Sequence, residues 1–484
     1  AITALGPLQL QRSTVKDMVD VGRLAPNASL QTTAQKGVQN FFIRGMGVSG
    51  TSPSDEPAVG IFQDGVYWGS NYGALNELLD VEGIELLRGP QGTLFGRNVT
   101  GGAVTVRSAR PSQTPYNRFT AGLSNGIGID GSAVLNGPVG NTLSARLAVS
   151  GRYNEGLFRN IHLDRPYGKT SVAIVRPSVK WEPSTRFNLT VIGEYYHQSG
   201  DPITSRGVSP NNVPNGPRTL AEIAGYASSP NYWDVQPDLQ GRTDINVYFL
   251  MGEMNAEIGP GTLTSITGYR KVSSLNITDY DGFPVVGFHQ NVNSRQHQFS
   301  EELRYAADLN EWLGFTAGGY YFEQKVNFTE ARDLNNSVTQ LATRSDLDNS
   351  SYALFAEADI RPYPGLTLTV GGRYTHEKKV AFTSPFGSCP YDLSSACTFQ
   401  TLPADKADNF APKVGLSYQI DQTKLVYASF TKGFRSGGFS LRGTPLASPY
   451  KSESVAAYEA GLKTDLLDRR VRFNLTGYYN KYDN

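Results

Sequence analysis

The sequence predicts a mostly β protein: a transmembrane antiparallel β-barrel that follows a small N-terminal α+β domain. From Tyr116 onward, segments of about ten residues alternate apolar and polar side chains, as barrel strands do when one face meets membrane lipid. Short turns alternate with long polar loops, near 154–170, 198–241, 274–291, 327–348, 378–407 and 435–450, which is typical of the two ends of such a barrel. The alternative is a soluble, glycine-rich β protein, and composition alone does not separate the two.

Composition narrows the class of protein. The 484 residues carry a formal net charge of zero, which argues against a nucleic-acid partner because such proteins usually present a basic surface. The sequence has no run of roughly 18 apolar residues, which excludes a membrane-spanning helix, whereas barrel strands need no such run. The 26 Tyr, 23 Phe and 51 Gly suit the aromatic girdles and tight turns of a barrel.

The first helix is expected to begin at Ser13 or Thr14 and to end at Leu24, because either hydroxyl can cap it and a proline follows. Gly45–Gly50 matches the glycine pattern of dinucleotide-binding loops. The proline-containing segment after it cannot supply the helix that such a site requires, so we interpret it as a glycine-rich loop. Ile61–Tyr67 predicts a hairpin with an Asp-Gly turn.

The N-terminal domain is organised around Val81–Pro111. An apolar run ending in Arg88 predicts a strand, Gly89-Pro90 predicts a turn, and Ala103–Val106 alternates as a second strand. Nothing in this stretch places a nucleophile beside a base or a phosphate at the start of a helix.

This stretch also resembles a known family. IELLRGPQGTLFGRNVTGGAVTV is similar to the hallmark plug segment of TonB-dependent outer-membrane receptors, and FIRG (42–45) and VGIFQDGVY (59–67) resemble two earlier plug signatures. The resemblance implies a plug at residues 1–111, a linker at 112–115 and a barrel from 116 to 484. It implies a receptor of the Gram-negative outer membrane that imports scarce nutrients, energised by the TonB complex and the proton-motive force. The family's short coupling box ahead of the plug is absent from this sequence.

About fifteen strands can be counted to Asp483, whereas the resemblance implies 22. We therefore expect a C-terminally truncated barrel: a curved, open sheet that partly wraps the plug, with unpartnered edges at 116–125 and 470–482. Charged residues such as Arg146 and Glu194 fall on the polar face of their strands. They predict a water-filled lumen, because a charge facing lipid costs roughly 2–4 kcal/mol at mid-bilayer.

The sequence argues against an enzyme, and it predicts no catalytic residue, cofactor or metal. None of the five histidines lies in an HExxH motif or beside a serine elbow. His289 and His297 are interpreted as loop and strand-end residues. Cys389 and Cys397 are predicted to form a disulfide in an oxidising compartment. Partial metal ligation is the alternative for this pair, but no nearby histidine pair completes a site.

The resemblance implies that plug loops form the floor of an outward-facing ligand site. Tyr67, Trp68 and Tyr72 could stack on a ligand there or pack against the barrel wall, and the sequence leaves both roles open. The expected ligand is a ferric siderophore or a similar bulky nutrient, with carbohydrate or cobalamin as alternatives. A passive porin is the rival of another class, although porins carry no such N-terminal domain. A soluble β adhesin is a second rival.

Two arginines suggest how the plug is held. Arg44 and Arg88 each end a predicted plug strand in a glycine-bounded turn, where a guanidinium group is costly unless it is paired. Glu459 lies on the polar face of its predicted strand. We expect these three residues to form a water-poor ionic cluster between plug and wall, as the resemblance also implies. The alternative is that each arginine pairs within the plug.

Overall fold

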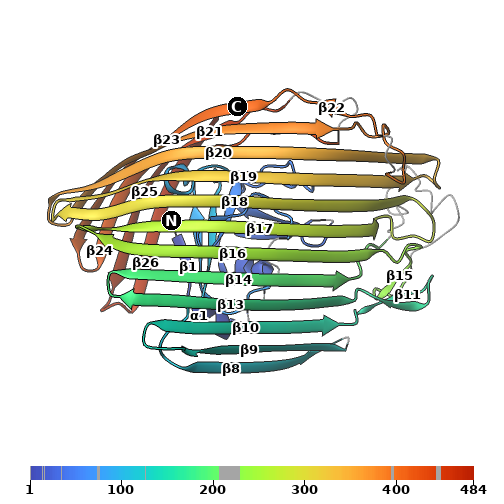
Figure 1. The fold of residues 1–484 in the computed structure, drawn as a ribbon, viewed down its shortest axis with the longest axis horizontal. Helices are drawn as coiled ribbons and strands as arrows, with labels where there is room; N and C mark the ends of the chain where they lie inside the picture. Colours follow the sequence, from blue (N-terminus) through green and yellow to red (C-terminus); the bar gives the residue numbers. More distant parts are fainter. Residues whose placement is uncertain are drawn as a thin grey trace.

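The structure is a computed structural model that describes residues 2–13, 15, 17–33, 35–73, 77–125, 127–206, 229–393, 397–442 and 449–483. One large antiparallel sheet curves around a small N-terminal domain (Figure 1). None of the helices in these ranges has the length and apolar character needed to cross a membrane.

The N-terminal domain is α+β and contains a five-stranded sheet. The sheet order is β1 (Ile2–Leu5), β6 (Val81–Arg88), β7 (Gly102–Ser108), β4 (Val59–Gln63) and β5 (Val66–Tyr67). β4 runs parallel to β7, and the other neighbours are antiparallel. A second hairpin pairs β2 (Ala28–Thr32) with β3 (Gln39–Ile43). The core between these elements includes the buried side chains of Met18, Val21, Ile84, Leu86 and Val104.

The prediction of one helix from residue 13 or 14 to Leu24 has the correct end but the wrong start. Two short helices are present, α1 (Pro7–Arg12) and α2 (Met18–Leu24). The N-cap of α2 is Asp17, whose carboxylate accepts a hydrogen bond of 3.0 Å from the backbone N–H of Asp20. Ser13 follows α1 in a turn, and Thr14 lies outside the described residues.

The organising stretch has the two predicted strands, β6 and β7, and one element that was not predicted. α3 (Gly92–Phe95) is a single helical turn between them, in the segment for which the sequence predicted only a turn. It lies against the large sheet, where the Thr93 hydroxyl donates to the Ala411 carbonyl oxygen at 3.1 Å. The predicted Asp64-Gly65 turn joins β4 to β5, with both residues at positive φ.

The large sheet has 16 strands, and consecutive long strands pair as neighbours. In chain order they are β8 (Tyr116–Ser124), β9 (Gly128–Pro138), β10 (Leu143–Asn154), β13 (Thr170–Ser184), β14 (Phe187–Gly200), β16 (Arg242–Ile258), β17 (Gly261–Asp279), β18 (Phe288–Asn310), β19 (Leu313–Leu334), β20 (Thr339–Tyr363), β21 (Leu366–Thr383), β22 (Gln400–Thr401), β23 (Asp405–Asp421), β24 (Lys424–Arg435), β25 (Glu453–Leu466) and β26 (Val471–Asp483). Across the described residues, β8 pairs only with β9 and β26 only with β25, so the sheet is open, as expected.

The two faces of the sheet differ in chemistry, as the alternation predicted. Large apolar side chains such as Leu250, Leu354 and Phe410 are exposed on the outside. Polar side chains such as Arg270 and Asn276 are buried on the inside, where they bond to the N-terminal domain. The barrel therefore presents an apolar surface to lipid and a polar wall to the domain that it surrounds.

The longer connections gather at one end of the strands (Figure 1). At that end, β11 (Phe158–Asn160), β12 (Arg165–Tyr167) and β15 (Asp234–Val235) form a small sheet, which we call the cap sheet. The loops expected near 274–291 and 327–348 are wrong in extent, because β17 continues to Asp279 and β19 to Leu334. Strands that extend beyond the apolar band have no lipid to face, so their sequences lose the alternation that marks a barrel strand.

Candidate functional site

The candidate site is the polar interface between the N-terminal domain and the inner wall. Side chains or carbonyl groups of the domain bond to β10, β16, β17, β18, β21 and β25 through the pairs Asp80–Arg146, Arg110–Glu253, Tyr72–Arg270, Tyr67–Gln298, Glu56–Lys379 and Arg44–Glu459. Many of the charged side chains of the wall thus pair with the domain, whereas others, such as Arg176 and Glu194, pair with each other. The polar face that the sequence predicted for these strands therefore meets the domain.

One deeply buried group of charges at this interface is the Arg97 cluster, which comprises Glu56, Arg97, Asn98, Glu377, Lys379 and Ser436. Arg97 Nη1 lies 3.0 Å from the Glu377 carboxylate, and both side chains are at most 6% exposed. Lys379 pairs with Glu56 and also donates to the Gly437 carbonyl oxygen at 2.6 Å. Two cations therefore face two anions, and each buried charge has a partner of opposite sign.

Asn98 connects the Arg97 cluster to the backbone of the wall. Its amide nitrogen donates to Glu56 and, at 2.9 Å, to the Tyr67 hydroxyl, while its amide oxygen accepts from the Ser436 N–H at 3.0 Å. The backbone N–H of Asn98 donates to the Phe434 carbonyl oxygen at 3.0 Å. Its φ of 60° is left-handed, a region that asparagine tolerates better than most residues. The domain is therefore joined to the end of β24 by both main chain and side chain.

Electrostatics fix the charge state of Arg97. Burial alone would lower the pKa of this guanidinium group, but the charges of Glu377 and Glu56 hold the pKa above its ordinary value. The group also lies over the Phe322 ring, 4.4 Å from its centroid. Arg97 is thus a permanent buried cation whose stability depends on partners from the wall.

The three residues expected to form an ionic cluster lie around one recess, but they do not all bond to one another. Arg44 Nη2 lies 2.8 Å from the Glu459 carboxylate, and the guanidinium group is 3.8 Å from the centroid of the Tyr478 ring. Arg88 instead donates within the domain, to the Thr3 hydroxyl at 2.7 Å and to a backbone carbonyl. Arg44 thus has the expected geometry, whereas Arg88 has the geometry of the alternative.

The aromatic residues considered for ligand binding pack against the wall. Tyr67, Trp68 and Tyr72 are each at most 3% exposed. The Tyr67 ring meets Phe322 edge-on at 5.8 Å, and the guanidinium group of Arg270 lies 4.0 Å from the Trp68 ring centroid. No ring face among the three is open to a ligand in this arrangement, so of the two roles the geometry matches packing.

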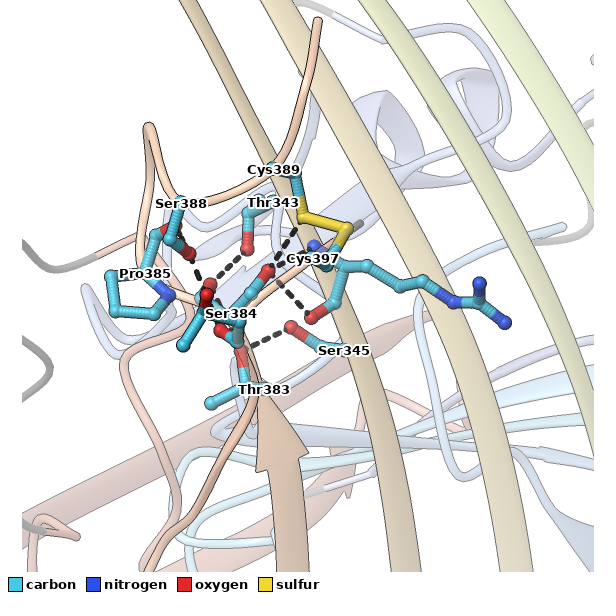
Figure 2. The surroundings of a disulfide bond; sticks show 10 residues. Thr343, Ser345, Thr383, Ser384, Pro385, Ser388, Cys389 and Cys397 are labelled. Atoms are coloured by element: carbon cyan, nitrogen blue, oxygen red, sulfur yellow. Dashed lines mark hydrogen bonds between the residues drawn. A yellow bond between two sulfur atoms is a disulfide. The ribbon is translucent and has the colours of Figure 1, made fainter. Parts of the chain in front are cut away.

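Cys389 and Cys397 are joined by a disulfide, with Cα atoms 4.2 Å apart (Figure 2). The adjacent Ser384 hydroxyl accepts a hydrogen bond of 2.8 Å from the backbone N–H of Arg344, which ties the loop after β21 to β20. Ser394 and Ser395, which were expected to help the chain turn back, lie outside the described residues.

Reducing this disulfide is expected to loosen the loop and to leave the barrel intact. By the chain-entropy model, closing so short a loop is worth about 2–3 kcal/mol. Hydrogen exchange should therefore accelerate at residues 384–393 after reduction, while amides of β20 and β21 keep their protection. Loss of protection along both strands would contradict this, because it would mean that the disulfide holds the wall as well as the loop.

A curved, open wall of β-strands around an N-terminal α+β domain, joined to it by buried ion pairs, has the architecture of a barrel closed by an internal domain, and the family comparison agrees. The profile described as "TonB dependent receptor-like, beta-barrel" matches residues 177–484, and the "TonB-dependent Receptor Plug Domain" profile matches residues 1–103. The chain belongs to the TonB-dependent receptors, which are transport proteins of the Gram-negative outer membrane. We therefore call the N-terminal domain the plug.

Individual relatives are receptors for pesticin, metal-pseudopaline or ferric yersiniabactin. The chain is 31% identical over 454 residues to the pesticin receptor of Yersinia enterocolitica, covering 92% of this chain and 62% of the relative. It is 23% identical to the metal-pseudopaline receptor of Pseudomonas aeruginosa, covering 86% and 59%. The ferric yersiniabactin uptake receptor of Yersinia pestis has the same fold, with a TM-score of 0.83 at 18% identity, covering 100% of this chain and 72% of that structure. The chain thus spans about three fifths of the length of these curated relatives.

Proposed function

We propose that this chain forms the plug and much of the barrel of a receptor that imports a ferric siderophore or a similar metal complex, energised through TonB. The supporting observation is that the plug bonds to the wall from β10 to β25. A solute of that size can pass only if these contacts are broken, which requires work. A passive porin, the alternative of another class, needs no such barrier.

The outer end of the interface offers groups suited to such a ligand. Arg332 and Arg442 share the carboxylate of fully buried Glu330, at 2.6 and 2.7 Å, and both arginine side chains are about a quarter exposed. The guanidinium group of Arg332 lies 4.6 Å from the centroid of the Phe386 ring. Partly exposed guanidinium groups beside aromatic rings favour an anionic chelate that carries planar groups, through charge and stacking. We therefore propose that the ligand first contacts this end of the interface, near Tyr72.

Uptake assays test the proposal directly. In a Gram-negative host lacking its own siderophore receptors, a receptor containing this chain should import at least one complex from a panel of iron-55-labelled siderophores. Import should cease when the host lacks TonB, because the plug then stays in place.

Two variants test the ligand contacts. Arg332→Gln should weaken uptake, while Arg472→Gln, at an exposed pair on β26, should not. Uptake that persists without TonB would favour the passive porin. Import of only labelled cobalamin or oligosaccharide would show that the ligand belongs to that class and not to the metal complexes.

A further inference from the structure

Three side chains converge at the end of the sheet that carries the cap sheet. Asp238 follows β15 of the cap sheet, Asp279 ends β17, and His289 lies near the start of β18. His289 Nε2 lies 2.7 Å from an Asp238 carboxylate oxygen and 3.7 Å from an Asp279 carboxylate oxygen. All three candidate ligand atoms lie within 4.8 Å of one another.

We propose that Asp238, Asp279 and His289 bind one divalent transition-metal ion of the Zn²⁺ class, which fastens the cap sheet to the β17–β18 hairpin. This inference goes beyond the proposed import function and does not depend on it. The chemistry of the donors supports it, since one imidazole nitrogen and two carboxylate oxygens are common protein ligands of Zn²⁺. The charge also fits, because two carboxylates balance one divalent cation.

The donors lie close enough together to converge on one ion. Ligand bonds of about 2.0 Å place tetrahedral donor atoms about 3.3 Å apart. The two distances from His289 Nε2, 2.7 and 3.7 Å, lie on either side of this value, and all three donor atoms lie within 4.8 Å of one another, so the side chains must shift to bind an ion. The Asp279 side chain is fully buried, whereas those of Asp238 and His289 are 19% and 14% exposed. The partly exposed side leaves an entry path for the ion and for a water, which would serve as the fourth ligand.

The surroundings hold the donors in place without competing for the ion. The buried amide of Asn160, in β11, donates to the Pro237 carbonyl oxygen at 2.8 Å and so fixes the residue before Asp238. Asp279 accepts from the Gly282 N–H at 2.9 Å through one oxygen and from the Asp238 N–H at 3.1 Å through the other. Backbone donors of this kind orient a carboxylate and leave lone pairs for a metal.

A buried hydroxyl group nearby gives an independent reason to expect a ligand. Tyr167, in β12, is fully buried, and its hydroxyl has no hydrogen-bond partner among the described residues. Asp201 and Asp279 lie close enough to act on this hydroxyl electrostatically. A buried polar group without a partner costs about 1–3 kcal/mol. A water bound to the ion could bond to this hydroxyl, for which the described residues offer no partner.

Metal titration of the purified, chelator-washed protein tests the proposal. Calorimetry with ZnCl₂ should show one site per chain, and CoCl₂ should give the visible absorption bands of a tetrahedral Co²⁺ site. Hydrogen exchange at residues 229–241 should slow when Zn²⁺ binds. His289→Gln keeps a hydrogen-bonding side chain but removes the imidazole ligand. Its affinity should fall by more than the roughly 10–100-fold that loss of an outer partner costs.

The matched control is His376→Gln. His376 also pairs with a carboxylate, Asp408, at 2.8 Å, but it lies outside this cluster on another part of the wall. This variant should bind Zn²⁺ as the unsubstituted protein does. Absence of Zn²⁺ and Co²⁺ binding, or binding that His289→Gln leaves unchanged, would overturn the assignment. None of these results depends on uptake, so the proposed import function is tested separately.

Discussion

Replacing Arg97 by methionine is expected to destabilise the seated plug by about 3–5 kcal/mol, the usual cost of removing one partner of a buried ion pair. Methionine keeps much of the side-chain volume, so the loss is mainly one of charge. Glu377 would then be left 3% exposed without the cation that faces it. Because the Arg97 cluster is shared between plug and wall, the substitution weakens the attachment of the plug to the wall.

Hydrogen exchange of the plug strands measures this effect. Amides of β6 and β7 should exchange at least about 100-fold faster in Arg97→Met, since roughly 1.4 kcal/mol corresponds to a factor of ten. Arg472→Met is the matched control, because Arg472 pairs with Asp465 at 2.8 Å on the exposed surface of β25 and β26. The control should exchange like the unsubstituted protein, since exposed pairs contribute little. Equal protection in both variants would show that the Arg97 cluster does not hold the plug.

The sequence predicted those features that local chemistry determines. Gly89-Pro90 and Asp64-Gly65 mark turns because proline fixes φ and glycine permits positive values. The alternation from Tyr116 onward predicted the faces of the barrel strands, since each strand within the apolar band has one face on lipid. α1 and α3 were missed because six and four residues are too few to show a helical period. The start of α2 was predicted too early because Asp17 was not recognised as its cap.

The interface could not be predicted in the same way. Arg97 and Glu377 are 280 residues apart, and Asn98 and Ser436 are 338 apart, so no local pattern links them. The signal in the sequence is indirect: Asn98 lies among the glycines of the hallmark segment. In the structure, Asn98 has a left-handed φ. The roles of Tyr67, Trp68 and Tyr72 were ambiguous for a related reason. The sequence of a loop is the same whether its aromatic side chain packs against the wall or against a ligand.

Replacing Gly102 by alanine is expected to disrupt the plug sheet itself. Gly102 is the first residue of β7, opposite Arg88 of β6, and its φ of +149° is one that residues with a side chain rarely adopt. A Cβ atom there would overlap the backbone oxygen of Leu87 and lie 3.1 Å from the Ile43 side chain. The oxygen is main chain and cannot rotate away, so the strands must separate locally. Backbone strain and overpacking each cost about 1–3 kcal/mol, and here they add.

Gly252→Ala is the control for this substitution. Gly252 also lies within a strand, β16, but its φ is not in the positive range and no atom lies within 4 Å of the position of an added Cβ. Limited proteolysis and hydrogen exchange should find β6 and β7 opened in Gly102→Ala and unchanged in Gly252→Ala. Arg97 and Asn98 lie in the connection between these two strands, so the opening should also release the Arg97 cluster from β24. A Gly102→Ala plug that stays protected at both β7 and residues 96–101 would show that the backbone can relax around the added methyl group.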